Sequence, residues 1–248
     1  MRFINQFMGW LLRMSYDFVS SIIPGDSKVI SNYAIAILLL AIIIKLITMP
    51  LTMKQSKSMA KSRALQPKIK ELQEKYGKDT QTIARKQQEL YKEAGVNPLG
   101  GCLPLLVQMP ILISMWNVVR QPELYAFTEP GMYEAMNKSL FCISNLNEVD
   151  VTLILPIAAA AVSFLNQKLM MAVNKPVGTG NSEQDKAMEQ SNNMMSIMMP
   201  VMMFFIYRSL PAVLPFYMII SMGLSTLTQL YVNKKIERDL KQEGEISR

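Results

Sequence analysis

A run of apolar residues from Ser31 to Leu51 constrains this chain more than any other feature of its sequence. The run reads SNYAIAILLLAIIIKLITMPL, and it is long enough to cross a bilayer, because a membrane-spanning helix needs about 20 mostly apolar residues. One charged residue, Lys45, lies inside it. A lysine near the middle of a spanning helix costs about 2.5–3.5 kcal/mol on insertion scales, so such residues commonly line a cavity or mark a function. The sequence therefore predicts an integral membrane protein with an intramembrane cation.

The remaining charges lie between further apolar runs, and their sign changes from one connection to the next. Residues 52–98 hold eleven Lys or Arg against five acids, a net charge of +6. Residues 120–150 hold two basic residues against five acids, a net charge of −3. Because the cytoplasmic loops of membrane proteins carry the excess of Lys and Arg, the first connection is expected inside the cell and the second outside.

This alternation predicts an all-α membrane protein with five transmembrane helices, its N-terminus outside and its C-terminus in the cytoplasm. A cytoplasmic helical hairpin and an N-terminal amphipathic interfacial helix complete the expected fold. The expected segments are an external amphipathic segment (1–28), a first span (29–51), the hairpin (52–98), a second span (99–119), an external loop (120–150), a third span (151–171), a cytoplasmic loop (172–192), a fourth span (193–207), a fifth span (213–232) and a cytoplasmic tail of frayed helix (233–248).

Local signals refine the ends of this layout. Residues 1–23 repeat apolar side chains at helical spacing and include Trp10 and Tyr16, which favours a helix on the outer membrane surface over the alternative of an uncleaved signal-like segment. In the hairpin, helices are expected at 53–76 and 80–94, because Gly77 suits a helix C-terminus, Asp79 suits an N-cap and Gly95 closes the second helix.

Two of the expected spans are unusual. The second contains Pro104 and Pro110, which predicts a kinked helix. The fourth is rich in methionine and covers 15 residues, about 22 Å at the rise of an α-helix, which predicts local thinning of the bilayer or a partner helix at one end.

The residue inventory argues against catalysis and against a metal site. Histidine, the commonest general base and metal ligand, is absent. The two cysteines, Cys102 and Cys142, fall near opposite faces of the expected membrane, so a disulfide between them is not expected. We therefore expect no enzymatic activity and no cofactor.

Several short motifs resemble the YidC-type membrane protein insertases, and the resemblance covers about residues 30–232. The block of residues 96–111, with Asn-Pro-Leu-Gly-Gly-Cys near its start and Gln-Met-Pro-Ile at its end, is the most specific part. The other matching motifs are the intramembrane basic residue Lys45 followed by Met49-Pro50-Leu51-Thr52, Leu65-Gln66-Pro67-Lys68-Ile69, Met199-Pro200 and Leu214-Pro215-Phe216-Tyr217.

The resemblance implies a catalyst of insertion that makes no covalent bond. It implies five core helices around a hydrophilic groove, open to the cytoplasm and to lipid and closed outside, with Lys45 as its basic residue. Such a protein would act on nascent membrane proteins, alone or beside the Sec translocon, in the bacterial plasma membrane. The ribosome, the signal recognition machinery and anionic lipids are the further expected partners, and DNA is not one.

The chain departs from the family pattern at two positions. Relatives usually carry Arg where this chain has Lys45, and often Trp where it has Met218. Arg presents a planar, always charged fork, whereas Lys is a point charge. A requirement for bidentate geometry is therefore in doubt here, and a requirement for positive charge is not.

Polar residues of the spans are the candidate substrate-binding residues of the groove. For each of them, hydrogen bonding between helices is an open alternative. Lys45 has an alternative of its own, because it lies about 7–8 Å from Pro50 along a helix and could snorkel to the cytoplasmic headgroups. The candidates are Lys45, Gln108, Asn117, Asn166, Ser221, Ser225 and Gln229.

Two other function classes stay open on the residues alone. A small transporter or channel needs a polar path across the whole bilayer, and the polar residues of these spans gather in the cytoplasmic half. An intramembrane hydrolase needs a nucleophile and a base, and a pair of Lys45 with a serine has no motif to support it.

Overall fold

The computed structural model describes residues 2–27, 29–77, 79–95, 103–173 and 183–246. Over these residues the chain is mostly helical and forms no β-strand, only isolated bridges, so the all-α class is confirmed for the described part. The helices are α1 (Arg2–Ile22), α2 (Asn32–Ala64), α3 (Gln66–Tyr76), α4 (Thr80–Glu93), α5 (Leu103–Arg120), α6 (Pro122–Tyr125), α7 (Met132–Ala135), α8 (Ile154–Val173), α9 (Glu183–Tyr207) and α10 (Val213–Ile246).

Three stretches of helix in the described residues are long and apolar enough to span a membrane, and they lie in Asn32–Tyr76, Ile154–Met171 and Val213–Lys235. These correspond to the first, third and fifth expected spans. The apolar parts of α5 and α9 are shorter, at Leu106–Arg120 and Ser196–Tyr207. The second and fourth crossings therefore stay predictions.

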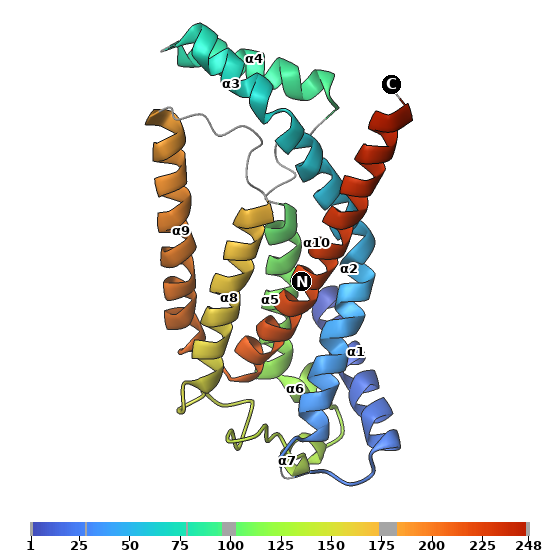
Figure 1. Ribbon diagram of the computed structural model, residues 1–248. Helices are drawn as coiled ribbons and strands as arrows, with labels where there is room; N and C mark the ends of the chain where they lie inside the picture. The colour runs from blue at the N-terminus through green and yellow to red at the C-terminus, as the bar shows by residue number, and fades with distance from the viewer. Residues whose placement is uncertain (1, 28, 78, 96–102, 174–182, 247–248) are drawn as a thin grey trace.

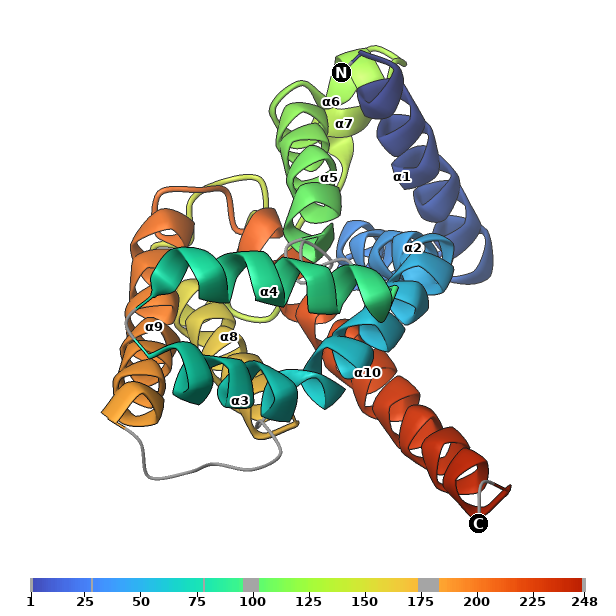
Figure 2. The same ribbon diagram turned by 90° about the horizontal axis from the view of Figure 1, so that it is seen from above.

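The long helices form one bundle, in which α10 packs against α2, α5 and α8 (Figure 1). Helix α9 packs on α8, and α1 packs on α2 and α5. The pair α3–α4 lies across one end of the bundle, and the loop that carries α6 and α7 lies at the other (Figures 1 and 2). The described parts of residues 66–95 and 121–150 therefore lie at opposite ends of the bundle, and the side of the membrane on which each lies stays a prediction.

The first span and the hairpin are divided differently from the expectation. Helix α2 runs straight through Pro50 to Ala64, and the break falls at Leu65. Pro67 is the reason, because it has no amide proton to donate to the carbonyl four residues back, and this missing bond is tolerated in the first turn of a helix, where Pro67 lies in α3. The expected single helix 53–76 is therefore wrong.

The caps expected in the hairpin are confirmed. Gly77 ends α3 with a φ of 56°, in the region that favours glycine. The Asp79 side chain accepts a hydrogen bond from the Thr82 amide (3.1 Å) at the start of α4. Hydrogen bonding to the side chain of Thr82, and then to its amide, lowers the pKa of the Asp79 carboxyl. Gly95, with a φ of 61°, follows the end of α4.

The expected cytoplasmic loop 172–192 is also divided differently. Its residues 174–182 lie outside the described part, and α9 begins already at Glu183, so that helix has 25 residues instead of the 15 expected for the fourth span. The added turns hold Glu, Gln, Lys, Ala and Met, which are good helix formers. The expected tail continues α10 as helix to Ile246.

Helix α1 is a packed part of the bundle, although the sequence favours a surface helix. Met8, Leu11 and Leu12 are buried on one side of it, while Phe3 and Trp10 are exposed on the other. The helix itself is confirmed, and its place at the outer membrane surface stays a prediction. Through this buried side, α1 packs against both α2 and α5.

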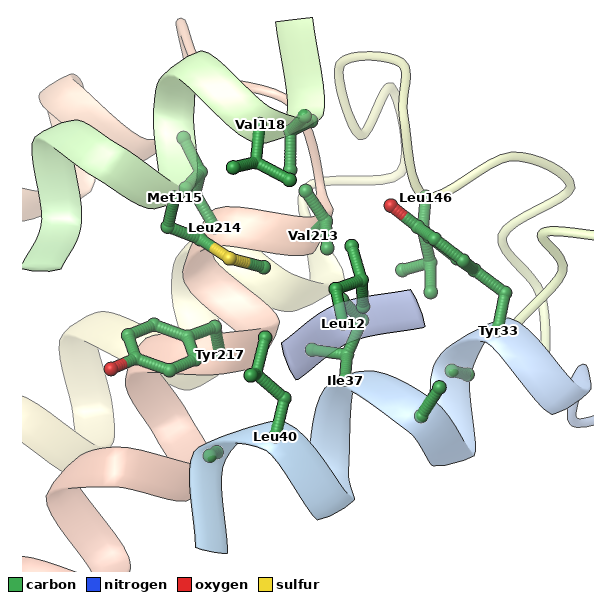
Figure 3. Packing of buried hydrophobic residues seen from close by; sticks show 14 of the residues in the cluster. Leu12, Tyr33, Ile37, Leu40, Met115, Val118, Leu146, Val213, Leu214 and Tyr217 are labelled. Carbon is green, nitrogen blue, oxygen red and sulfur yellow. The ribbon is translucent and has the colours of Figure 1, made fainter. Parts of the chain in front are cut away.

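The core lies between α1, α2, α5, α10 and the segment after α7 (Figure 3). Tyr33, Ile37 and Leu40 of α2 are fully buried there. Apolar side chains that meet this way lose their contact with lipid or water and fix the relative positions of the helices. Figure 3 shows α2 facing Leu12, Met115, Val118, Leu146, Val213, Leu214 and Tyr217.

Candidate functional site

A polar hollow lies between α2, α5 and α10, in the half of the bundle nearer to the α3–α4 pair. Its cavity volume is about 70 Å³, and about 10–15 Å³ of such volume is enough for one water molecule. The hollow can therefore hold several waters among helices that otherwise pack through apolar side chains. It is lined by Ile44, Lys45, Thr48, Leu51, Thr52, Gln55, Val107, Gln108, Ile111, Tyr217, Ser221, Ser225 and Gln229.

The polar residues that α2 contributes share one helix face. Lys45, Thr48, Thr52 and Gln55 follow one another at intervals of three, four and three residues, which places them in one line. The Thr48 hydroxyl donates to the Ile44 carbonyl (2.9 Å), and the Thr52 hydroxyl donates to the Thr48 carbonyl (3.0 Å). Both threonine protons are thus used inside the helix, and their oxygens remain as acceptors.

Helix α10 presents a second polar line across the hollow. Tyr217, Ser221, Ser225 and Gln229 follow at intervals of four residues and therefore share a face. Tyr217 interacts with Ser221 and with Gln108 of α5. The side-chain oxygen of Gln229 is buried and has no hydrogen-bond partner within the described residues. A buried acceptor of this kind costs free energy until water or a ligand supplies a proton donor.

Lys45 is half-buried and is the one charged residue among those that line the hollow. Its Nζ donates to the Ser225 hydroxyl oxygen (2.7 Å), which joins α2 to α10. No carboxylate lines the hollow in the described part of the chain. The ammonium charge therefore lacks a counter-ion there, and at this depth charge pairs are stronger than in water.

Five of the seven residues predicted from the sequence meet in the hollow. They are Lys45, Gln108, Ser221, Ser225 and Gln229.

The other two candidates do not line the hollow. Asn166 of α8 accepts a hydrogen bond from the Thr226 hydroxyl of α10 (2.9 Å), the interhelical alternative that the sequence left open. Asn117 is half-buried near the end of α5, away from the lining residues.

Sequence reasoning missed four polar residues of the hollow, namely Thr48, Thr52, Gln55 and Tyr217. Helical periodicity counted from Lys45 would have found the first three, because they continue its face of α2 toward the hairpin. Gln55 and its neighbour Ser56 are buried, although the sequence places them in a polar hairpin.

The opposite end of the bundle is tied together by backbone hydrogen bonds from the loop that carries α6 and α7. The Phe141 amide donates to the Val29 carbonyl (2.6 Å), and the Ser31 amide donates to the Ser139 carbonyl (3.0 Å). These two bonds join the loop to the start of α2.

Three further bonds join the same loop to α5 and α10. The Val213 amide donates to the Leu146 carbonyl (2.7 Å), and the Ala212 amide donates to the Glu148 carbonyl (2.8 Å). The side-chain nitrogen of Asn147 donates to the carbonyl of Val119 near the end of α5 (3.1 Å). The loop thus bridges three helices directly beyond the core.

An ion pair fastens α1 to this end. The Arg13 guanidinium binds both oxygens of the Glu129 carboxylate and also donates to Asp17 (2.8 Å). It lies over the Phe127 ring, 5.8 Å from the ring centroid. The hydrogen bond from Arg13 lowers the pKa of the Glu129 carboxyl, and the same bond raises the pKa of Arg13.

Within the described residues, no group of three or more His, Cys, Asp or Glu is placed to hold a metal ion. Cys142 is exposed and free, and Cys102 lies outside the described part. The expectation that the protein needs no cofactor stays a prediction.

Comparison with known proteins places these features in a family. The family model described as 60Kd inner membrane protein matches residues 26–239. The chain is 36% identical to Membrane protein insertase YidC of Fusobacterium nucleatum over 228 residues, 92% of this chain and 99% of that protein. It is 39% identical to Membrane protein insertase YidC 2 of Listeria innocua, over 86% of this chain and 68% of that protein. Membrane protein insertase MisCA of Bacillus subtilis is 36% identical over 82% of this chain and 70% of its own length.

Proposed function

The chain belongs to the YidC-type family of membrane protein insertases, and on that premise we propose that it moves short external segments of client proteins across the bacterial membrane. The client segment enters the polar hollow from the cytoplasm, crosses the remaining membrane, and its apolar helix leaves sideways into lipid. The N-terminus then lies outside and the C-terminus in the cytoplasm. Nascent membrane proteins are the substrates.

One observation carries this proposal: the hollow holds a lone cation and a buried acceptor without a donor, in the half of the bundle nearer to the α3–α4 pair. Lys45 has no carboxylate partner among the lining residues, and the Gln229 oxygen has no donor within the described residues. A client segment with a carboxylate and peptide N–H groups supplies what both lack. The hollow thus fits an acidic, extended polypeptide better than an apolar ligand.

The energetic role of the hollow follows from the cost of taking polar groups into hydrocarbon. A peptide group without a hydrogen-bond partner costs about 2–7 kcal/mol on transfer to an apolar medium. A wet hollow shortens the hydrocarbon path for such groups, and the attraction of a client carboxylate to Lys45 offsets part of the remaining cost. Burial of the client's apolar helix in lipid drives the process without ATP.

The direction of the Lys45 side chain supports the groove interpretation over snorkelling. Its ammonium reaches across to Ser225 of α10, and does not end among the lysines of the hairpin. A point charge held by one hydroxyl does not need the bidentate geometry of Arg. The usual Arg of the family is therefore replaced here by a residue that keeps the charge.

The closed external end supports one-sided access. The loop that carries α6 and α7 ties α2, α5 and α10 together beyond the core, whereas the hollow lies toward the α3–α4 end. Access from the cytoplasm follows if the basic hairpin lies inside, as its charge predicts.

Sideways release is supported by α9, whose expected span of 15 residues (193–207) covers about 22 Å at the helical rise, against about 30 Å of hydrocarbon. A bilayer that adjusts to this helix is thinner beside it. Met194, Met198 and Met202 are exposed on α9, and their flexible side chains suit contact with many different client helices. We propose this Met-rich surface as the path along which clients leave.

Further partners follow from the hairpin charge. The exposed basic residues of α3 and α4 are suited to anionic lipid headgroups, the ribosome and the signal recognition machinery. Cooperation with the Sec translocon is part of the same proposal.

A hydrolase would use the Lys45–Ser225 pair as base and nucleophile. Ser225 lies inside a continuous helix, where neighbouring backbone amides bond to carbonyls four residues back and none is free to stabilise an oxyanion. We therefore propose insertion without cleavage, and an intact client is the expected product.

Insertion into liposomes of defined lipid composition tests the proposal. A single-span client with a short acidic external tail is added to vesicles with and without the purified protein, and protease protection of the tail is measured. The protein should raise the protected fraction several-fold and leave a trapped small solute inside. Solute loss without protection would favour a channel, and shortened client would favour a hydrolase.

A further inference from the structure

One residue of α10, Ser225, accepts a hydrogen bond from the lone cation of the hollow. We infer that Ser225 is a positioning residue, which holds the Lys45 ammonium in the hollow and thereby sets a preference for clients with acidic external segments. This inference rests on the proposed insertase function and assigns a role to one residue of the same hollow.

The geometry singles out this pair. The Lys45 ammonium and the Ser225 hydroxyl are 2.7 Å apart, although the two residues are separated by 180 positions in the chain. Ser221, one turn away on the same face, is engaged with Tyr217. Among the described residues, the Lys45 ammonium has no second hydrogen-bond partner. Two of its three N–H groups are therefore available to a ligand in the hollow.

The alternative position of the ammonium explains why an anchor is needed. A lysine stem is flexible, and an unanchored ammonium in a spanning helix moves toward the nearest water and headgroups. Lys45 is about 7–8 Å from Pro50, so the cytoplasmic end of the hollow is within a short distance. The Ser225 hydroxyl holds the Lys45 ammonium on the α10 side of the hollow. Because the hydroxyl is neutral, the ammonium keeps its attraction for a client carboxylate.

The same argument predicts client selection. A client carboxylate meets two free ammonium donors when Ser225 holds Lys45 in place. Without the hydroxyl, the ammonium lies nearer to the cytoplasmic water. Attraction at that position does not help the client carboxylate to cross the membrane. A carboxylate introduced at position 225 would pair with the ammonium directly and remove the preference altogether.

The test compares two clients that differ only in charge, one with two acidic residues in its external segment and one with the matching amides. The quantity measured is the ratio of their insertion rates into proteoliposomes, because a folding defect lowers both rates and leaves the ratio unchanged. Ser225→Ala should lower the ratio about tenfold, the scale of one charge-assisted hydrogen bond. Ser225→Thr should restore it, and Ser225→Asp should bring it to one or below.

The matched control is Thr228→Val, which removes another α10 hydroxyl. Thr228 donates to the Leu224 carbonyl (2.8 Å) and does not line the hollow, so its variant should keep the wild-type ratio. A wild-type ratio in folded Ser225→Ala would overturn the inference. So would an equal loss in the Thr228 variant.

A second measurement does not depend on insertion. A charged acylating reagent is added to proteoliposomes, and its reaction with Lys45 is quantified by peptide mass spectrometry relative to the exposed Lys54. Ser225→Ala should raise the relative labelling of Lys45 several-fold, because the ammonium then reaches the cytoplasmic water. Unchanged labelling refutes the positioning role. Failure of the wild-type protein to insert either client contradicts the proposed function instead.

Discussion

Gly9 lies where α1 packs against α6, and we predict that Gly9→Ala loosens this contact. The added Cβ would lie 2.0 Å from the carbonyl oxygen of Tyr125 and 2.5 Å from its carbonyl carbon. Both are backbone atoms, so a change of side-chain rotamer cannot relieve the overlap. Either α1 or α6 must move, and the buried side of α1 moves with it.

Two effects of opposite sign determine the magnitude. Alanine in place of glycine at an unstrained position stabilises a protein by about 0.4–1 kcal/mol. Overpacking costs about 1–3 kcal/mol, and a 2.0 Å approach lies so far inside normal contact distance that we expect about 3 kcal/mol. The net loss is about 2 kcal/mol, which lowers the Tm by about 4–8 °C for a chain of this size.

The assay is thermal unfolding in detergent, followed by tryptophan fluorescence. Gly223→Ala is the matched control, because Gly223 also lies within a helix and an added Cβ there meets no atom within 4 Å. The control should leave the Tm unchanged or raise it by up to about 4 °C. A Gly9→Ala protein as stable as the wild type, beside a control that behaves as expected, would refute the packing of α1 on α6.

Three further predictions concern other parts of the bundle. Asp150→Ala removes the carboxylate that accepts backbone amides at the start of α8, and should destabilise the protein by about 0.5–2 kcal/mol, measured as a lowered Tm. Glu129 has a pKa lowered by Arg13, so its ion pair stabilises the fold above the ordinary carboxyl pKa. That stability is lost as the pH falls through the lowered pKa. In a titration of Tm, Glu129→Gln should therefore show a smaller acid-side dependence than the wild type, and an unchanged profile would contradict the pairing. Asn166→Ala removes the bond from Thr226, and should lower the Tm while the insertion of acidic clients stays at the wild-type level. Loss of insertion without loss of stability would show that Asn166 acts on clients and does not only join α8 to α10.

Much of this fold is predictable because a bilayer restricts what a sequence can do. The long apolar runs of α2, α8 and α10 and the charge of the connections are read directly from composition. The caps at Gly77 and Asp79 follow from local chemistry, and the structure has both. These features depend on residues close together in the chain.

The helix boundaries were harder to predict because propensity competes with polarity. Residues 183–192 are polar, which favours a loop, yet they are good helix formers and α9 includes them. Pro50 is a helix breaker in water, yet α2 continues through it, because neighbouring groups in a membrane bundle can satisfy the freed carbonyl.

Helical periodicity and the family motifs predict only part of the site. Lys45 stands out as a charge in an apolar run, but its partner Ser225 lies 180 residues away and nothing local connects them. Asn166 and Asn117 look the same as Gln108 in sequence, and only the packing of α5, α8 and α10 separates them. The loop that carries α6 and α7 has a polar sequence, yet Phe127, Leu140 and Leu146 are buried in it, because its contacts come from distant helices.

The most direct test of the account is the insertion of the acidic-tailed client into proteoliposomes that hold wild type, Lys45→Arg or Lys45→Ala, each checked for an unchanged Tm. The account predicts that wild type and Lys45→Arg insert the client, whereas Lys45→Ala falls to the level of empty vesicles. If folded Lys45→Ala inserts the client as fast as wild type, the charge in the hollow does not carry the activity, and the central claim is wrong.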